Sequence, residues 1–289
     1  MVTIYQLRVK HYIKNLLIFF PLFYSGNFFQ FDTLIDVFWA FLSFSFVASL
    51  IYIINDFMDL KFDRLHPVKR NRPLPSGRIS KYHLLTLVVV LLFLIVFINY
   101  FLLNNIFGIV IQSIYLLMNI LYSYRLKNMP IIEIFIVASG FIFRILLGGV
   151  IADVTISEWL YLTVMSVALF MTTGKRRNEY KNDKKSRKVL ENYTLDFLDK
   201  FTYLFLTLTV VFYALWAIFN TTFNNNQLLL WTVPIVLIIV MQYVSNLESK
   251  KHGDPTEVLL NDKALVLLSI TYVITMFLLI YSELLLEAI

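Results

Sequence analysis

Long apolar stretches with few charged residues dominate this chain and leave it few ways to fold. Stretches such as 82–103 and 264–286 are long enough to cross the ~30 Å hydrocarbon core of a membrane as helices, and 59% of the 289 residues are hydrophobic. Inside hydrocarbon each backbone N–H and C=O must find a partner within the protein, which favours helices over open sheets. The sequence therefore predicts an all-α polytopic membrane protein.

Nine spans are expected, and the first and the sixth are irregular. The first contains Pro21 and Gly26 and is alternatively a re-entrant segment, while the sixth is short, so that the sequence supports eight or nine spans. No Gly/Ser-rich linker divides the chain, which predicts a single transmembrane domain, residues 1–289. The expected spans lie at about residues 15–31, 37–54, 82–103, 105–122, 131–150, 159–173, 201–219, 228–245 and 264–286.

Positive charges sort between alternate loops of this nine-span arrangement. Of the 25 Lys and Arg residues, all but Arg144 lie before the first span or in the loops that follow even-numbered spans. The opposite loops, such as "ADVTISE" and "NTTFNNNQ", contain neither residue type. Cytosolic loops carry an excess of Lys and Arg. We therefore expect a multi-pass protein of the cytoplasmic membrane with its amino terminus in the cytosol.

The composition also excludes several kinds of site. Cysteine is absent, so the chain has no disulfide or thiolate metal site, and the four histidines show no metal-ligand spacing. The net charge of +6 does not indicate a nucleic-acid partner, because aromatic and basic residues do not alternate on any soluble segment. The sequence leaves open whether the chain forms a homo-oligomer.

The segment "NDFMDLKFDRLHPVKRNRPLPSG", residues 55–77, places carboxylates directly after an apolar span. Asn55, Asp59 and Asp63 are spaced i, i+4, i+8, which puts them on one stripe of a helix, with Asp56 beside it. Like charges this close repel unless a cation neutralises them. Oxygen ligands without His or Cys favour Mg²⁺, which is usually shared with substrate phosphates.

Basic residues follow these carboxylates and are suited to phosphate oxygens. A metal-bridged diphosphate would use both halves of the segment. The alternative, a solvated cytosolic loop that obeys the positive-inside rule, explains the basic residues but not the carboxylate stripe. The basic residues are Arg64, Lys69, Arg70, Arg72 and Arg78.

The segment resembles the NDxxDxxxD motif of the UbiA superfamily of intramembrane prenyltransferases. Further motifs resemble the branch of decaprenyl-phosphate phosphoribosyltransferases in the same order over residues 8–265. These are "RVKHYIKNLLIFFPLF", "HPVKRNRPLPSG", "YSYRLKNMPIIEI", "GFIFRILLGGV", "GKRRNE", "VLENYT" and "DPTEVLLNDKAL". The resemblance implies a UbiA-type bundle that transfers a 5-phosphoribosyl group from phosphoribosyl diphosphate (PRPP) to a polyprenyl phosphate. Such a reaction would supply a lipid-linked pentose for cell-envelope polysaccharide.

The resemblance also implies roles for individual residues. Asp56, Asp59 and Asp63 would form the catalytic centre and, with Asn55, would hold Mg²⁺ and the donor diphosphate. The substrate-binding residues would be Arg64, Lys69 and Arg72, together with Lys14, Asn15, Tyr122, Lys127, Lys175, Arg176 and Glu179. Where aromatic prenyltransferases carry a second Asp-rich motif, "GKRRNE" has basic residues and one Glu, which favours phosphate binding over a second metal cage.

Arg144 is a charge within an apolar span, which costs at least ~2.5 kcal/mol on insertion scales. We therefore expect its side chain to face the bundle interior, as a substrate-binding or buried paired group. The basic residues near helix ends have a second interpretation as anchors to anionic lipid.

Two other functions remain open from the sequence. A UbiA-type prenyltransferase would use an allylic diphosphate donor and an aromatic or other acceptor, and the altered second motif argues against it. A transporter would show several charges along a pathway through the membrane, whereas only Arg144 is a charge in the middle of a span.

Overall fold

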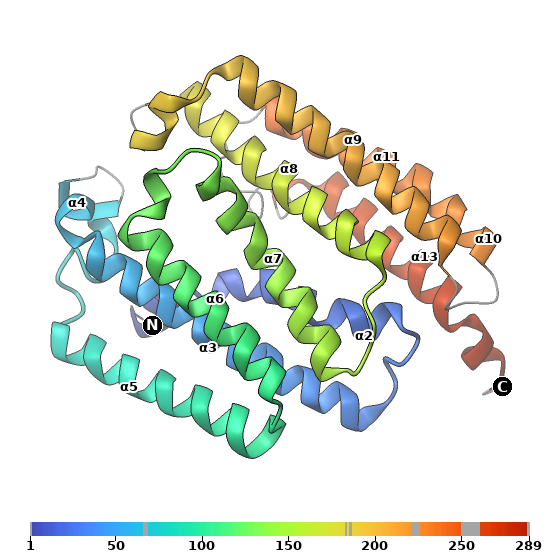
Figure 1. The fold of residues 1–289 in the computed structure, drawn as a ribbon, viewed down its shortest axis with the longest axis horizontal. Helices are drawn as coiled ribbons and strands as arrows, with labels where there is room; N and C mark the ends of the chain where they lie inside the picture. The colour runs from blue at the N-terminus through green and yellow to red at the C-terminus, as the bar shows by residue number, and fades with distance from the viewer. Residues whose placement is uncertain are drawn as a thin grey trace. The chain divides into compact units, whose positions relative to one another are not determined.

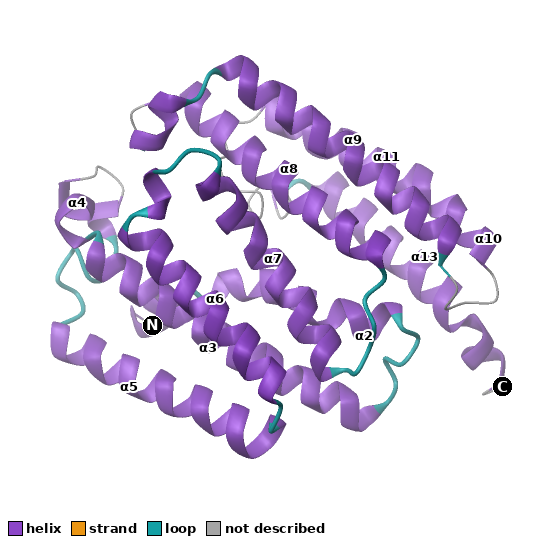
Figure 2. Ribbon diagram, in the orientation of Figure 1, coloured by secondary structure: helices purple, strands orange, loops and turns teal. Residues whose placement is uncertain are grey.

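The computed structural model consists of helices joined by short loops (Figures 1 and 2). It describes residues 2–65, 69–182, 184, 187–220, 226–249 and 261–287, and this part of the chain contains no β-strand. The all-α prediction is confirmed. The elements are α1 (Val2–Leu7), η1 (Val9–Phe19), α2 (Phe20–Tyr24), α3 (Phe31–Met58), α4 (Leu60–Leu65), η2 (Lys69–Asn71), α5 (Lys81–Phe97), η3 (Ile98–Leu103), α6 (Ile106–Tyr124), η4 (Leu126–Asn128), α7 (Ile132–Ile151), α8 (Glu158–Asn182), η6 (Lys188–Asn192), α9 (Leu195–Phe219), α10 (Asn226–Leu229), η7 (Leu230–Thr232), α11 (Val233–Ser249) and α13 (Lys263–Glu287).

Seven helices in the described residues are long and apolar enough to cross a membrane, which supports a multi-pass membrane protein. Two of the nine expected spans are not among them. The first is divided between η1 and the short α2, at whose start Pro21 lies, and proline has no backbone N–H to continue a helix. The sixth lies in α8, whose carboxyl-terminal turns are charged. The seven spans are Phe31–Met58, Lys81–Leu103, Ile106–Tyr124, Ile132–Ile151, Leu195–Phe219, Leu230–Glu248 and Lys263–Ser282.

The chain forms two compact units, and α7 is divided between them. Unit 1 consists of Met1–Lys127 and Phe143–Thr155, and unit 2 of Asn128–Ile142 and Ile156–Ile289. The single domain expected from the sequence stays a prediction.

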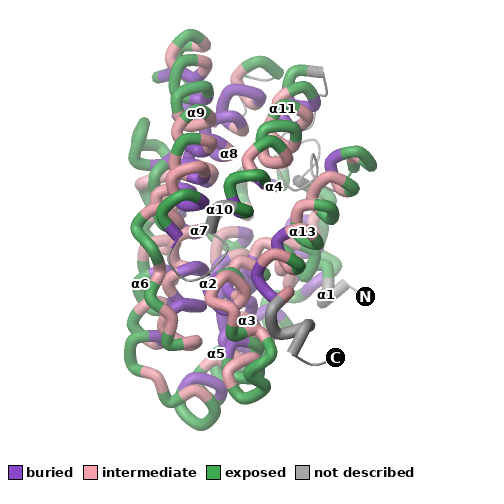
Figure 3. The backbone as a smooth tube through the Cα atoms, turned by 90° about the vertical axis from the view of Figure 1, so that its right-hand side faces the viewer, coloured by how far each residue is buried: buried purple, intermediate pink, exposed green. Residues whose placement is uncertain are grey.

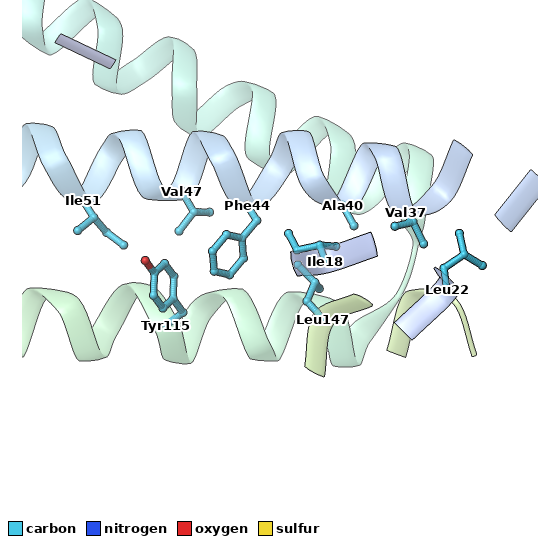
Figure 4. Packing of buried hydrophobic residues seen from close by; sticks show 9 residues of the cluster. All are labelled: Ile18, Leu22, Val37, Ala40, Phe44, Val47, Ile51, Tyr115 and Leu147. Carbon is cyan, nitrogen blue, oxygen red and sulfur yellow. The ribbon is translucent and has the colours of Figure 1, made fainter. Parts of the chain in front are cut away.

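Helix α3 is the centre of unit 1. In the most apolar stretch of α3, 61% is buried, against 22% in the corresponding stretches of α5–η3 and α6. The other helices therefore pack around α3. In the core, Phe44 of α3 stacks on Tyr115 of α6 at 4.6 Å between ring centroids. Ile18 of η1 and Leu147 of α7 complete this cluster (Figure 4). Burial of these side chains fixes η1 and the second half of α7 against α3.

A buried polar triad ties three helices of unit 1 together. Asn99 of η3 donates to Ser43 of α3 at 2.7 Å, and Ser43 donates to Gln112 of α6 at the same distance. Gln112 in turn donates to Asn99 at 2.8 Å. Polar groups that hydrogen-bond to one another inside an apolar bundle connect helices where hydrophobic packing has little preference for one partner.

Unit 2 is built on the packing of α8 against α9. Its core contains Ala168 and Leu169 of α8, Leu198 of α9, and Leu190 of η6. Helix α11 packs against α9 and α13. Tyr193, which follows η6, links it to the segment before α7, because its hydroxyl accepts a hydrogen bond from the backbone N–H of Ile131 at 2.8 Å.

Exposed apolar side chains run along the outer face of α6. They recur at spacings of three and four residues, which is one face of a helix. Figure 3 shows exposed positions along α6 in green. A stripe of this length in water would be unfavourable, whereas lipid tails solvate it. The stripe consists of Phe107, Val110, Ile114, Leu117 and Leu121.

Gly148 of α7 allows η1 to approach closely, which generates a stability prediction. A Cβ at this position would lie 2.9 Å from the carbonyl carbon of Ile18 and closer still to its oxygen, and both belong to rigid backbone. Gly148→Ala should therefore lower the midpoint of thermal unfolding, because overpacking costs about 1–3 kcal/mol.

Gly108→Ala is the matched control. Its Cβ would meet the flexible end of the Ile151 side chain at 3.2 Å, and alanine has the higher helix propensity. Its midpoint should stay at or above that of the parent protein. Equal midpoints for the two variants would contradict the close approach of η1.

Candidate functional site

The carboxylates of residues 55–63 lie where α3 ends and α4 begins. Asp59 is the C-cap of α3 and has left the helical conformation, with φ −91° and ψ 5°. Its backbone still continues the chain of hydrogen bonds, from the Asp59 N–H to Asn55 O at 2.9 Å and from the Asp63 N–H to Asp59 O at 2.8 Å. The segment is therefore two helices with a break at Asp59, where the sequence suggested one continuous stripe.

This break pairs different carboxylates from those that the i, i+4, i+8 spacing suggested. Asp56 and Asp63 are both buried and share one cation, since Arg72 Nη1 lies 3.1 Å from Asp56 Oδ1 and 2.8 Å from Asp63 Oδ2. Seven residues are about two helical turns, so Asp56 and Asp63 lie on one side of the helix pair. Arg72, predicted to bind phosphate, bridges them.

The loop that carries Arg72 is held against α3 by apolar contacts. Leu74 and Ile79 are buried in a cluster with Leu50 and Ile53 of α3. Gly77, with φ +76°, makes the turn between them, a backbone conformation that glycine adopts without a Cβ clash. The apolar anchors thus place the Arg72 guanidinium over the carboxylates.

The other two ligand candidates face α6 and the segment after it. Asp59 pairs with Lys127 of η4, with 2.6 Å between Oδ1 and Nζ. Asn55 Oδ1 accepts a hydrogen bond from Ser123 of α6. Tyr122, next to Ser123, is half-buried. The structure thus brings Lys127 to a carboxylate of the segment, while Tyr122 stays a predicted site residue.

Two residues of the N-terminal arm, residues 2–8, also contact this segment. Together with the carboxylates, Asn55, Arg72, Ser123 and Lys127 they form the first group of the site. Arg8 Nη2 lies 2.6 Å from Asp56 Oδ1, and Gln6 Nε2 donates to Asp56 Oδ2 at 3.1 Å. Sequence analysis missed both as site residues. Arg8 was visible only as a basic residue in "RVKHYIKN", and no sequence signal distinguishes Gln6.

Three other predicted residues lie in α4, η2 and η1. Arg64 of α4 is exposed. Lys69 begins η2, and its side chain lies outside the described residues. Lys14 of η1 is half-buried.

Arg144 is buried in unit 1, as expected for a charge within an apolar span. Its Nε donates to Asn15 Oδ1 at 2.8 Å, and Asn15 Nδ2 donates to Ser45 at 2.8 Å. The guanidinium also lies over the rings of Phe44 and Tyr115, at 4.9 and 5.6 Å from their centroids. Aromatic faces stabilise a cation in a desolvated place, which explains how this charge is accommodated.

The predicted residues of "GKRRNE" form a second group, within unit 2. Arg176 is 1% exposed, and it binds Glu133 through two bonds of 2.6 and 2.7 Å. Its Nη1 also donates to Glu179 at 2.8 Å, and Arg187 lies 3.2 Å from the same carboxylate oxygen. Lys175, one residue before, is half-buried. Glu133 was missed, although an acidic residue at the start of an apolar span is a usable signal.

Electrostatics in this group follow from the ion pairs. Burial alone would raise the pKa of Glu179, but Arg176, Arg187 and Lys175 outweigh it and hold the pKa below its ordinary value. Burial, together with the Glu133 carboxylate, raises the pKa of Tyr193 to about 12. Glu179 is therefore ionised at neutral pH, and Tyr193 keeps its proton as a hydrogen-bond donor.

The first group has the donor chemistry of a divalent-cation site. It offers three carboxylates and an amide oxygen, the ligands that Mg²⁺ prefers. Gln6 Oε1 is also buried beside Asp56, and no described residue donates a hydrogen bond to it, an arrangement that a cation or water would satisfy. Within the described residues, however, no three acidic or His side chains are gathered around one point. Arg8, Arg72 and Lys127 pair with the carboxylates instead.

The chain is similar to known proteins over most of its length. The model of the UbiA prenyltransferase family matches residues 17–270. The chain is 32% identical over 285 residues to a decaprenyl-phosphate phosphoribosyltransferase of Corynebacterium glutamicum, with 95% of this chain and 85% of that protein covered. It is 32% identical over 282 residues to the protein of the same name from Mycolicibacterium smegmatis, with 92% and 88% covered.

A solved structure has the same fold. The UbiA homolog from Archaeoglobus fulgidus bound to GPP and Mg²⁺ matches with a TM-score of 0.70 and 19% identity, over 97% of this chain and 99% of that chain. At this identity the likeness concerns the fold. Divalent metal binding is a property of that homolog, and the oxygen donors of residues 55–63 are consistent with it.

The buried Glu133–Arg176 pair gives a stability prediction. Glu133→Gln keeps the shape of the side chain but leaves Arg176 with one fewer carboxylate, and breaking a buried pair costs about 3 kcal/mol. The midpoint of thermal unfolding should fall clearly. Asp196→Asn is the control, because Asp196 and its partner Lys200 are both 73% exposed and such pairs contribute little. A Glu133→Gln midpoint within the range of the control would show that the pair is not stabilising.

Proposed function

The chain belongs to the UbiA prenyltransferase family, and on that premise we propose that it transfers a 5-phosphoribosyl group from PRPP to a polyprenyl phosphate. The observation that carries the proposal is the similarity, over 92–95% of the chain, to relatives named decaprenyl-phosphate phosphoribosyltransferase. The basic residues at both groups support it, because both substrates carry phosphate. The product would be a lipid-linked pentose for a cell-envelope polysaccharide.

The reaction forms one C–O bond and breaks another. A phosphate oxygen of the lipid attacks the anomeric carbon of the ribose, and diphosphate leaves with the electron pair of the broken bond. The attacking phosphate is already anionic, so the enzyme needs no strong base. Its main tasks are to position the two anions and to stabilise the charge of the leaving group.

We assign the leaving diphosphate to the carboxylate segment and its basic neighbours. Arg64, Lys69, Arg72 and Lys127 would bind its oxygens. Asn55, Asp56, Asp59 and Asp63 would hold a divalent ion, for which Mg²⁺ is our proposal. When bound, that ion supplies further charge stabilisation to the diphosphate.

Other predicted residues receive supporting roles. Lys14, Asn15, Tyr122 and Arg144 remain proposed substrate-binding residues. Arg176 and Glu179 are committed to each other and to Glu133 and Arg187, which favours a positioning role. Lys175 then remains the phosphate ligand of "GKRRNE".

The proposal is tested by incubating membranes that contain the protein with ribose-labelled PRPP and polyprenyl phosphate. Label should enter the lipid phase, and release of diphosphate should match it. In a parallel arm, an allylic diphosphate with an aromatic acceptor tests the prenyltransferase alternative. Transfer in that arm alone would refute phosphoribosyl transfer.

Asp59 gives the sharpest mutational prediction for this activity. Asp59→Asn keeps the shape and removes one charge, and its side chain is 38% exposed, so the protein should still fold. Loss of an anchor for the divalent ion should lower the transfer rate by about 10²-fold. Activity of the parent protein should vanish with a chelator and return with Mg²⁺.

The control for this variant is Asp32→Asn, at the other end of α3. Asp32 is exposed, so the Asp32→Asn variant should transfer the phosphoribosyl group at the parent rate. A rate for Asp59→Asn equal to that of the control, or activity that survives chelation, would remove the metal–diphosphate role from the segment.

A cytosolic donor requires residues 55–77 to face the cytosol. The chain has no cysteine, so a single introduced cysteine reports one position. Lys81→Cys, exposed at the start of α5, should react with an impermeant reagent only after cells are opened, and Thr155→Cys, exposed in the loop before α8, should react in intact cells. The reverse pattern would invert the proposed orientation.

A further inference from the structure

Both oxygens of the buried Asp56 carboxylate are covered by nitrogen donors from outside α3. Arg8 and Arg72 both contact Oδ1, at 2.6 and 3.1 Å, while Gln6 donates to Oδ2 at 3.1 Å. Arg72 also holds Asp63 at 2.8 Å. The lone pairs that would bind a divalent ion are thus engaged by guanidinium and amide groups.

Arg8 is held at this position by its own surroundings. Its backbone is left-handed, with φ 53°, a conformation that non-glycine residues rarely adopt. Ser49 donates to the carbonyl of Leu7 at 2.8 Å, and the Arg8 guanidinium lies 4.6 Å from the ring centroid of Tyr52. The side chain nevertheless stays 23% exposed, so it can reach a ligand from solvent.

Charge balance limits what this group can bind. Three carboxylates, Asp56, Asp59 and Asp63, are matched by three cations, Arg8, Arg72 and Lys127. A divalent ion added alone would compete with these cations for the same oxygens. A diphosphate offers the cations new acceptors of at least equal strength, since guanidinium groups bind phosphate and carboxylate by the same paired geometry.

We propose that Arg8 and Arg72 occupy the place of the divalent ion on Asp56 and Asp63 and transfer to the diphosphate when the ion binds. Ion and diphosphate then bind cooperatively, because each releases the partner that the other needs. The inference assigns Arg8 of the N-terminal arm as a diphosphate-binding residue. It rests on the proposed function only in that the donor carries a diphosphate.

This exchange of partners by Arg8 predicts that one substitution changes the affinities for the ion and for the diphosphate in opposite directions. Arg8→Gln removes a competitor from Asp56, so the ion alone should bind more tightly. The same change removes a cation from the diphosphate, which should bind more weakly. A side chain that merely supports the fold would weaken both ligands or neither.

The experiment uses the purified full chain in detergent, with Mn²⁺ as the ion and labelled inorganic diphosphate as the anion. Free Mn²⁺ is measured by electron paramagnetic resonance without diphosphate, and diphosphate binding is measured at saturating Mn²⁺. For Arg8→Gln we expect Mn²⁺ affinity to rise and diphosphate affinity to fall, each by about 5-fold or more. Arg72→Gln, in a separate segment, should show the same pair of changes and serves if Arg8→Gln does not fold.

Lys61→Gln is the matched control for general electrostatics. Lys61 lies in α4, two residues before Asp63, and is exposed. Its loss should move neither affinity appreciably. If Lys61→Gln changes Mn²⁺ binding as much as Arg8→Gln, or if both Arg variants shift the two affinities in one direction, the exchange is refuted. Because the probes contain no ribose or lipid, this result is independent of whether phosphoribosyl transfer is observed.

Discussion

The bridge from Arg72 to Asp56 and Asp63 is the interaction on which the polar end of α3 depends. Two carboxylates this close repel, and burial strengthens the repulsion because little water screens them. One guanidinium bridges both carboxylates, and Arg8 supplies a second positive charge to Asp56. The apolar anchors Leu74 and Ile79 hold the Arg72 loop in place, so hydrophobic burial determines where the charge lies.

The sequence predicted the helices of this chain better than the pairing of its charges. Uninterrupted apolar stretches have few alternatives to a helix in a membrane, so α5, α6 and α13 lie close to the expected ranges. Charge pairing depends on backbone details that periodicity does not carry. Asp59 leaves the helix, and the arm residues Gln6 and Arg8 reach Asp56 across about 50 residues of chain.

The Glu133–Arg176 pair shows why a basic residue in a sequence motif is weak evidence of phosphate binding. An exposed Arg near a helix end and a fully buried one have the same letter in the sequence. Only the partner distinguishes them, and Glu133 lies 43 positions away from Arg176. Burial of this pair required a bidentate geometry and the additional contacts of Glu179 and Tyr193, since desolvated charges are costly unless their hydrogen bonds are satisfied.

The irregular first apolar stretch follows from the same requirement. Backbone that departs from the regular α-helix is tolerated in a membrane where protein surrounds it. The 3-10 helix η1 is surrounded in this way at Asn15, which lies between Arg144 of α7 and Ser45 of α3. Gly148 admits the η1 backbone against α7. A regular helix through Pro21 would have lost a backbone hydrogen bond and could not have kept these contacts in the same register. The stretch that looked like a span is therefore used to bury one amide and one guanidinium.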